Sequence, residues 1–226
     1  MFKPNRTIGN EALECENISK SYGEKKVLEN LSLKILPGDK IALIGANGVG
    51  KSTLVQILVE ELQADSGLVK WGATIERSYF PQNVSEEIKG EESLYDWLRG
   101  FDKKKESGEI RNALGRMLFS GEEQEKSINA LSGGEKHRMV LSKIMLEGGN
   151  FLVLDEPTNH LDLESIIALG EALYRFSGNV LCVSHDRELI DAYANRIIEL
   201  VPVENGAAKV IDFRGSYEEY LESKNA

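Results

Sequence analysis

The residues whose types and spacing most clearly suggest chemistry lie in the segment Gly45–Thr53, which fits G-x-x-x-x-G-K-S/T at every fixed position. The segment follows the apolar run Ile41–Ile44 and opens a helix-compatible stretch, Ser52–Glu61. Glycines let the backbone approach a phosphate closely, and a helix start adds the positive end of its dipole. A glycine-rich turn that carries Lys-Ser by chance is the alternative, but such turns usually lack this strand-loop-helix setting. We therefore expect phosphate contacts from Gly45, Ala46, Asn47, Gly48, Val49, Gly50, Lys51, Ser52 and Thr53, with Lys51 reaching the β- and γ-phosphates and Ser52 binding Mg²⁺.

Two adjacent carboxylates, Asp155 and Glu156, follow a second apolar run, Phe151–Leu154. Because neighbours on a strand face opposite ways, these two groups are not expected to share one proton. We assign Asp155 to the Mg²⁺ shell, through water, and Glu156 to the role of general base for an attacking water. The alternative is a strand end that is simply exposed to solvent.

Two further side chains are candidates for the same chemistry. His185 follows a third apolar run, Val180–Val183, and can contact a γ-phosphate and hold the attacking water; a structural capping role is the alternative. Gln82 can contact Mg²⁺ or water and report the presence of nucleotide to the segment that follows it. His137 and His160 have no partners at metal-ligand spacing, so we read neither as a ligand.

The segment Leu131–Glu135 contains Ser132 and Glu135 at the spacing of a capping box for the helix predicted over Gly134–Leu146. Its two consecutive glycines, Gly133 and Gly134, exceed what capping needs and would let another phosphate lie against this helix start. One nucleotide cannot easily occupy two helix N-termini on different lobes. The pattern therefore indicates that a second subunit completes the site.

The apolar runs that end in these groups alternate with helical segments, which indicates a parallel sheet covered on both faces. Ligands of such sheets bind at the carboxyl ends of the strands. An antiparallel portion is expected before the phosphate loop, from Ala12–Ser19 and Val27–Leu36, with two more strands, Leu68–Trp71 and Thr74–Phe80, around Gly72. Towards the C-terminus we expect a hairpin of Arg196–Val201 and Lys209–Asp212 around Asn205-Gly206, then a helix over Tyr217–Ser223.

From Val84 to about Ala130 the pattern changes to helical spacing, at Glu91–Leu98 and Glu109–Leu118, without a strand-like run. We interpret residues 83–130 as a helical subdomain inserted into an ATP-binding-type core of residues 1–82 and 131–226, all within one domain. The triplet Lys103–Lys105 in this insertion is either a solvated loop or a contact with nucleic acid.

The net charge, the cysteines and the lack of long apolar stretches argue against some classes of function. A net charge of −10 over 226 residues argues against broad nonspecific affinity for nucleic acid or anionic membrane, so such a partner would have to meet a local basic patch. The lone cysteines, Cys15 and Cys182, lie in strand-like runs and fit reduced core residues of a cytoplasmic protein. No apolar stretch approaches the length of a membrane span.

In these motifs the chain resembles the ATP-binding cassette (ABC) superfamily over nearly its whole length. Gly45–Thr53 is similar to the Walker A loop, Gln82 to the Q-loop, Leu131–Glu135 to the signature, Phe151–Glu156 to Walker B and Asn159–Asp162 to the D-loop. The resemblance makes His185 the switch histidine and places Tyr22 on the adenine. It implies an ABC ATPase fold, with a mixed sheet, an antiparallel β subdomain and a helical subdomain. It also implies Mg²⁺ and ATP, sandwiched between two cassettes, with nucleotide contacts from Ser132, Gly133, Gly134, Glu135 and Asp162.

A narrower resemblance is to the ABC-F group, cytosolic proteins with two cassettes in one chain and no membrane domain. It rests on Leu131–Lys136, Glu156–Asp162, Ser184–Arg187 and Gly215–Leu221. Phe2–Arg6 resembles the stretch after the linker between the cassettes, so we expect this chain to be the second cassette of a longer protein. The resemblance implies a partner cassette and, for the full-length protein, the ribosome with its rRNA and tRNA.

Two functional hypotheses follow. The first is the ATPase cassette of an ABC-F protein, weak when isolated because each site needs the partner's signature. The second is the motor subunit of a membrane transporter, although such cassettes more often have other residues where Asn159 and His160 stand. DNA-repair or condensin-like ATPases are discarded, because Gln82 and Leu131 are too close in sequence to enclose their long coiled coil.

Overall fold

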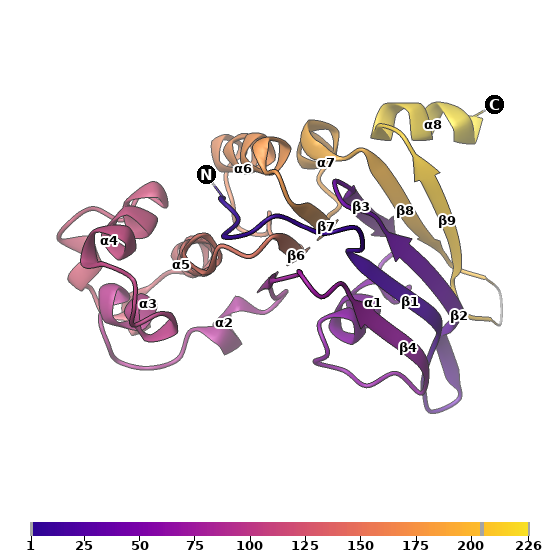
Figure 1. Ribbon diagram of the computed structural model, residues 1–226, viewed down its shortest axis with the longest axis horizontal. Helices are drawn as coiled ribbons and strands as arrows, with labels where there is room; N and C mark the ends of the chain where they lie inside the picture. Colours follow the sequence, from indigo (N-terminus) through magenta and orange to yellow (C-terminus); the bar gives the residue numbers. More distant parts are fainter. Residues whose placement is uncertain (1, 204–205, 226) are drawn as a thin grey trace.

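The computed structural model describes residues 2–203 and 206–225, which form two sheets and a group of helices to one side (Figure 1). The larger sheet has six strands in the order β5-β6-β7-β3-β8-β9, and the smaller has three in the order β2-β1-β4. The larger sheet consists of β3 (Lys40–Gly45), β5 (Arg77–Phe80), β6 (Phe151–Asp155), β7 (Asn179–Val183), β8 (Arg196–Val201) and β9 (Lys209–Arg214). The smaller consists of β1 (Leu13–Tyr22), β2 (Lys25–Ile35) and β4 (Ser66–Trp71).

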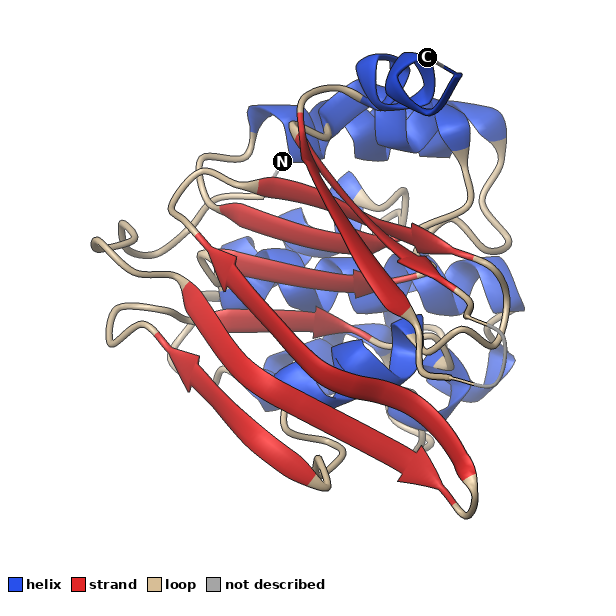
Figure 2. Cartoon of the chain, turned by 90° about the vertical axis from the view of Figure 1, so that its right-hand side faces the viewer, coloured by secondary structure: helices blue, strands red, loops and turns tan. Residues whose placement is uncertain are grey.

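The larger sheet is mixed, as the sequence predicts. Its strands β5, β6, β7, β3 and β8 run parallel, and only β9 pairs antiparallel, with β8. Every residue of β6 and β7 is buried, which explains why these strands read as continuous apolar runs. Figure 2 shows the two sheets with helices beside them. The parallel pairing brings the carboxyl ends of β3, β6 and β7 to one edge.

The two strands predicted on either side of Gly72 belong to different sheets. β4 pairs antiparallel with β1 in the small sheet, whereas β5 pairs in parallel with β6 in the large one. Asn150 fixes the start of β5, because its buried amide accepts from Glu76 N–H at 2.8 Å and donates to the Thr74 carbonyl at 2.8 Å. The chain therefore crosses between the sheets at residues 72–76.

The described helices include those predicted by range from helical spacing, although the helix predicted over Glu91–Leu98 begins three residues later, at Leu94. They are α1 (Lys51–Leu58), α2 (Val84–Glu87), α3 (Leu94–Phe101), α4 (Ser107–Arg116), α5 (Gly133–Glu147), α6 (Leu163–Arg175), α7 (Arg187–Tyr193) and α8 (Tyr217–Asn225), with short 3₁₀ turns at Glu123–Glu125 and Ile128–Ala130. Residues 83–130 contain no strand apart from an isolated bridge between Ser93 and Ser127. α5 packs against α2, α3 and α4, so it belongs by contact to the helical group (Figure 1).

Several local predictions are confirmed. Ser132 and Glu135 form the expected capping box at the start of α5. Asp162, for which the family resemblance implies a nucleotide contact, accepts from Ser165 N–H at 2.8 Å as the N-cap of α6. Cys15 and Cys182 are both free and buried. The predicted turn of the β8–β9 hairpin includes Asn205, which lies outside the described residues.

Two buried clusters of side chains stabilise the chain. One lies between the small sheet, α1 and one face of the large sheet; the other joins the opposite face to α5, α6, α7 and the helical group. At the end of the large sheet where β3 begins, buried Arg196 pairs with Asp39 at 2.6 Å and Asp212 at 2.6 Å. These contacts lie at the amino end of β3, so they stabilise the sheet rather than form part of a site at its carboxyl edge.

Among the described residues, no helix combines the length and the apolar character needed to cross a membrane.

Candidate nucleotide-binding site

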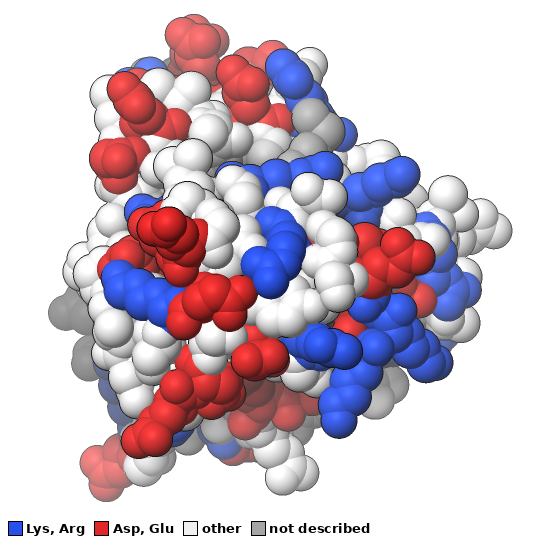
Figure 3. Space-filling model, turned by 90° about the vertical axis from the view of Figure 1, so that its left-hand side faces the viewer, with Lys and Arg blue, Asp and Glu red and all other residues white. Residues whose placement is uncertain are grey.

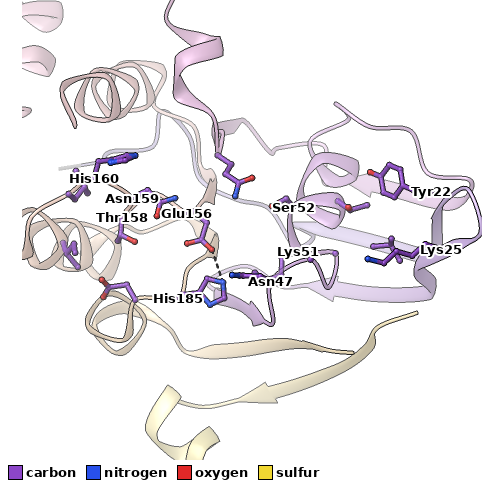
Figure 4. A pocket seen from close by; sticks show the side chains of 18 residues that line it. Tyr22, Lys25, Asn47, Lys51, Ser52, Glu156, Thr158, Asn159, His160 and His185 are labelled. Carbon is purple, nitrogen blue, oxygen red and sulfur yellow. Dashed lines mark ion pairs between the residues drawn. The ribbon is translucent and has the colours of Figure 1, made fainter. Parts of the chain in front are cut away.

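An open cleft of about 1030 Å³ lies at the carboxyl edge of the large sheet and extends to the small sheet. Figure 4 shows side chains from both sheets and from the loops after β6 and β7 around it. Of the predicted site residues, it brings together Tyr22, Asn47, Gly48, Gly50, Lys51, Ser52, Thr53, Gln82, Glu156 and His185. The cleft is long enough to separate an aromatic side chain at one end from a phosphate cradle and acidic groups at the other.

The phosphate loop owes its shape to its glycines. Gly45 has φ of 144°, and a Cβ there would lie 2.4 Å from the Leu200 carbonyl oxygen of the neighbouring strand. Gly50 is the N-cap of α1 in the left-handed region, and a Cβ there would lie 2.6 Å from the Val27 side chain. No side chain caps α1 in the described structure, which leaves its first N–H groups able to bind an anion.

Lys51 is buried at the start of α1, and its ammonium group bonds back to the loop. Its Nζ donates to the Gly45 carbonyl at 2.8 Å and to the Ala46 carbonyl at 3.2 Å. Burial lowers the pKa of Lys51, while the charges of Glu156 and Asp155 act in the opposite direction. The ammonium group therefore lies where it can exchange carbonyl partners for phosphate oxygens.

The structure points Asp155 and Glu156 to different partners, as their adjacency predicts. Asp155 is 1% exposed, and its Oδ1 accepts from the Ser52 hydroxyl at 3.4 Å. The other oxygen, Oδ2, is buried and has no hydrogen-bond partner. A buried carboxylate oxygen without a partner, next to a hydroxyl and a phosphate cradle, fits a hard cation such as Mg²⁺, which binds one or two carboxylates and phosphate oxygens. Asp155 and Ser52 can therefore hold the metal of a Mg²⁺–nucleotide.

Glu156 lies just beyond β6 with φ of 53°, a left-handed conformation that turns its side chain out of the sheet. Its Oε1 lies 3.3 Å from Nε2 of His185, and the dashed line in Figure 4 marks this contact. Burial raises the pKa of Glu156 and lowers that of His185. A carboxylate with a raised pKa beside an imidazole can accept a proton from a water that contacts both groups.

The remaining predicted residues lie outside the cleft lining. Gly45, Ala46 and Val49 lie in the phosphate loop but do not line the cleft, and Asp155 lies behind Ser52. Ser132, Gly133, Gly134 and Glu135 form the start of α5, where Glu135 is engaged by its capping contacts and by Lys126 at 3.0 Å. Asp162 caps α6 and lines a separate groove between α5 and α6. One copy of this chain therefore does not bring the signature segment into the cleft that contains its own phosphate loop.

Several residues that line the cleft are not among the predicted site residues, although some of them lie in segments that carry the family resemblance. These are Lys25, Val27, Thr158, Asn159, His160, Leu161, Ile166 and Asp186. The segment Thr158–His160 contributes only to the family resemblance, and its position directly after the Asp-Glu pair is the signal for a place in the site. No sequence pattern indicated Lys25, because its position beside the cleft depends on the turn between β1 and β2.

The raised pKa of Asp155 predicts how stability depends on pH. Burial raises this pKa to about 6 from an ordinary 3.8, with Glu156 adding to the effect and Ser52 and Lys51 opposing it. Between these two values the folded state holds a proton that the unfolded state has lost, so stability falls as the pH rises through that window and stays lower above it. Asp155→Asn should therefore raise the free energy of unfolding at pH 7 by on the order of 2 kcal/mol. Urea unfolding at pH 5 and pH 7 tests this: the gain should be larger at pH 7, and an equal gain at both values would contradict the assignment.

Comparison with known proteins agrees with this geometry. A parallel sheet with a phosphate loop, an Asp-Glu pair and a histidine at its carboxyl edge defines the class of nucleoside triphosphatases. The profile of the family described as "ABC transporter" matches residues 28–159. The chain belongs to this family of ATP-binding cassettes, and its predicted membership is confirmed. ATPase activity is consistent with this family.

Two curated relatives and one solved structure illustrate the similarity. The "Uncharacterized ABC transporter ATP-binding protein YkpA" of Bacillus subtilis (strain 168) is 49% identical over 98% of this chain and 41% of its own length. The "ATP-binding protein Uup" of Caulobacter vibrioides is 35% identical over 96% of this chain and 36% of its own. A bacterial Atm1-family ABC exporter with ATP bound has the same fold, with a TM-score of 0.79 at 17% identity, over 98% of this chain and 41% of that one. The chain thus spans about two fifths of the length of these relatives.

Proposed function

We propose that this chain is the ATP-hydrolysing cassette of an ABC-F type protein, in which closure around Mg²⁺–ATP against a second cassette acts on the ribosome. The observation that carries the proposal is the division of the site. Residues of the phosphate loop, Glu156 and His185 line one cleft, with Asp155 behind Ser52, whereas the start of α5 does not line this cleft and can complete the cleft of a partner.

We propose the following roles, which the positions of these residues and the family resemblance support. Lys51 and the N–H groups of α1 bind the phosphates, and Tyr22, 51% exposed at the far end of the cleft, stacks on the adenine. Ser52 and Asp155 hold Mg²⁺, while Gln82 contacts the metal or its water. Glu156 accepts the proton of the attacking water, which His185 orients. A partner cassette supplies Ser132, Gly133 and Gly134 to the γ-phosphate.

Support for the ABC-F assignment comes from the relatives whose names describe ATP-binding proteins of the Uup and YheS type. For the full-length protein we propose the ribosome and its RNA as partners, and the cytoplasm as its location. Figure 3 shows the end of the molecule formed by the helical group, where Lys and Arg side chains are interspersed with Asp and Glu. Lys103 and Lys104 are exposed in a loop of this group and can meet phosphate there in spite of the net charge of −10.

The second candidate function is the ATPase subunit of a membrane transporter. It is favoured by one observation, the name of the relative YkpA, which describes an ABC transporter ATP-binding protein. In both functions two cassettes close around ATP. The closed state would bind the ribosome in the first function and a membrane subunit in the second.

A sedimentation experiment separates them. The Glu156→Gln variant of the full-length protein should trap the closed state, because it binds ATP but hydrolyses it slowly. When cell lysates are spun through sucrose gradients with ATP, we expect this variant to co-sediment with ribosomes, and Lys51→Ala to stay in the light fractions. Recovery of the variant in the membrane fraction with an integral membrane subunit would instead establish the transporter function.

A further inference from the structure

Lys143, a mostly buried residue of α5, contacts two other helices of the helical group, α2 and α3, with one side chain. Its ammonium group forms an ion pair with Glu87 of α2 and lies 3.8 Å from Glu147 on α5 itself. The same Nζ lies 4.6 Å from the ring centroid of Phe101, at the end of α3. Only 13% of the Lys143 side chain is exposed. Because this ammonium group has so little contact with water, its charge must be stabilised by these protein partners.

The two helices joined by the Lys143–Glu87 pair begin at separate parts of the ATPase machinery. α2 starts two residues after Gln82, which lines the cleft, and Asn83 is its N-cap. α5 starts at the signature segment, with Ser132 as its N-cap. In Figure 1, α2 lies between the end of β5 and the rest of the helical group. A displacement of Gln82 therefore reaches α2 before any other helix.

Apolar contacts bring α2 and α5 together but leave their relative position weakly determined. Val84 and Ile88 are buried at this contact, and α2 is a single turn of four residues. Apolar burial is non-directional, whereas an ion pair has a defined geometry. If α2 moved without α5, Lys143 would keep only Glu147 of its own helix, at 3.8 Å, and the partly buried Glu87 would lose its cation, which is unfavourable. The pair therefore favours movement of the two helices as one body.

Without Lys143, the same arrangement would be repulsive. Glu87 and Glu147 share this one ammonium group as their close cation, and their side chains are 31% and 30% exposed. Burial raises the pKa of Glu147, and the charge of Glu87 raises it further, whereas Lys143 lowers it. Replacement of Lys143 by an uncharged residue would leave the carboxylates of Glu87 and Glu147 without this cation, and the carboxylate of Glu61, which also feels the charges of Glu87 and Lys143, would lose it too.

We propose that Lys143 is a positioning residue that couples Gln82 to the signature segment through its ion pair with Glu87. Nucleotide contact at Gln82 moves α2, and the pair transmits this movement to α5 and so to Ser132, which serves the partner's site. The inference rests on the proposed function, because it concerns the closure that the proposed function requires.

The test compares Lys143→Met, Lys143→Arg, Glu87→Gln and the charge exchange Lys143→Glu with Glu87→Lys. The matched control is Lys34→Met, which removes a lysine that pairs with Glu14 at 3.2 Å between β1 and β2, away from the helical group. Three quantities are measured: the Kd for ATP by fluorescence titration, kcat and KM for hydrolysis, and hydrogen exchange of residues 82–87 and 133–136 with and without ATP.

In Lys143→Met and Glu87→Gln we expect the Kd for ATP to stay within about twofold, while kcat falls roughly tenfold, the size of a typical coupling between sites. In wild type, ATP should slow exchange in both segments; in these variants it should slow exchange at 82–87 but no longer at 133–136. Lys143→Arg and the charge exchange should restore both kcat and the response of 133–136, since a positive and a negative side chain again face each other.

Other outcomes would overturn the proposal. An unchanged kcat and an unchanged response of residues 133–136 in Lys143→Met would limit Lys143 to a structural role. The same conclusion would follow if the charge exchange restored the melting temperature but not the coupling. A wild-type protein that neither binds nor hydrolyses ATP would instead contradict the proposed function itself, so the two failures are distinguishable.

Discussion

In Glu156→Gln we expect ATP hydrolysis to fall roughly 10²–10⁴-fold, the usual contribution of a general base, while ATP binding persists. The amide retains the size and position of the side chain beside His185, 3.3 Å away, but it cannot accept a proton from water. Phosphate release measured at saturating ATP gives the loss in kcat, and a fluorescent ATP analogue gives the affinity. Because hydrolysis should need two cassettes, the assay is run over a range of protein concentrations.

The same variant should form a dimer that depends on ATP and persists, since the closed state is no longer consumed by hydrolysis. Glu171→Gln is the matched control: this glutamate is exposed on α6, pairs with Arg175 at 3.4 Å, and should leave turnover unchanged. Full turnover in Glu156→Gln would show that another group accepts the proton, and a protein that remains monomeric at high ATP would contradict the site shared by two cassettes.

The second large effect is expected in Lys51→Ala, where the affinity for ATP should fall roughly 10- to 100-fold, as for the loss of hydrogen bonds to a charged group. Lys51 is 7% exposed, and its ammonium group already lies against the carbonyls of the phosphate loop, so binding needs little rearrangement of the side chain. Isothermal titration calorimetry with Mg²⁺–ATP measures the change.

Lys34→Ala serves as the control for loss of one positive charge, because Lys34 lies on β2 and outside the cleft. Melting curves of both variants establish that the fold is retained. An affinity for ATP in Lys51→Ala equal to that of wild type would contradict the assignment of the phosphate loop.

Much of the fold could be predicted from local pattern. The continuous apolar runs at Phe151–Leu154 and Val180–Val183 are the fully buried strands β6 and β7, because a strand covered on both faces has no polar side. The Ser132–Glu135 spacing gave the capping box of α5, since both partners lie within one helical turn. The predicted family is confirmed by a match over residues 28–159, which include the phosphate loop and the Asp-Glu pair.

Other features depend on pairing between distant segments and could not be predicted. Nothing in the sequence around Gly72 shows that β4 pairs with β1 and β5 with β6, because strand partners are chosen by the whole sheet. The helical spacing of residues 83–130 indicated an insertion, but not that α5 would pack with it. The contact of Lys143 with Glu87 joins residues far apart in the chain and leaves no periodic signal.

The sequence by itself determined the types of group that this cassette brings to nucleotide chemistry, because glycine-rich loops, capping boxes and strand-end carboxylates are local arrangements. Only the tertiary structure decided where those groups meet. Parallel pairing places β3, β6 and β7 side by side, which brings the phosphate loop, Asp155, Glu156 and His185 to one edge. The same packing directs the start of α5 away from that cleft, because α5 is bound to α2, α3 and α4 rather than to the phosphate loop.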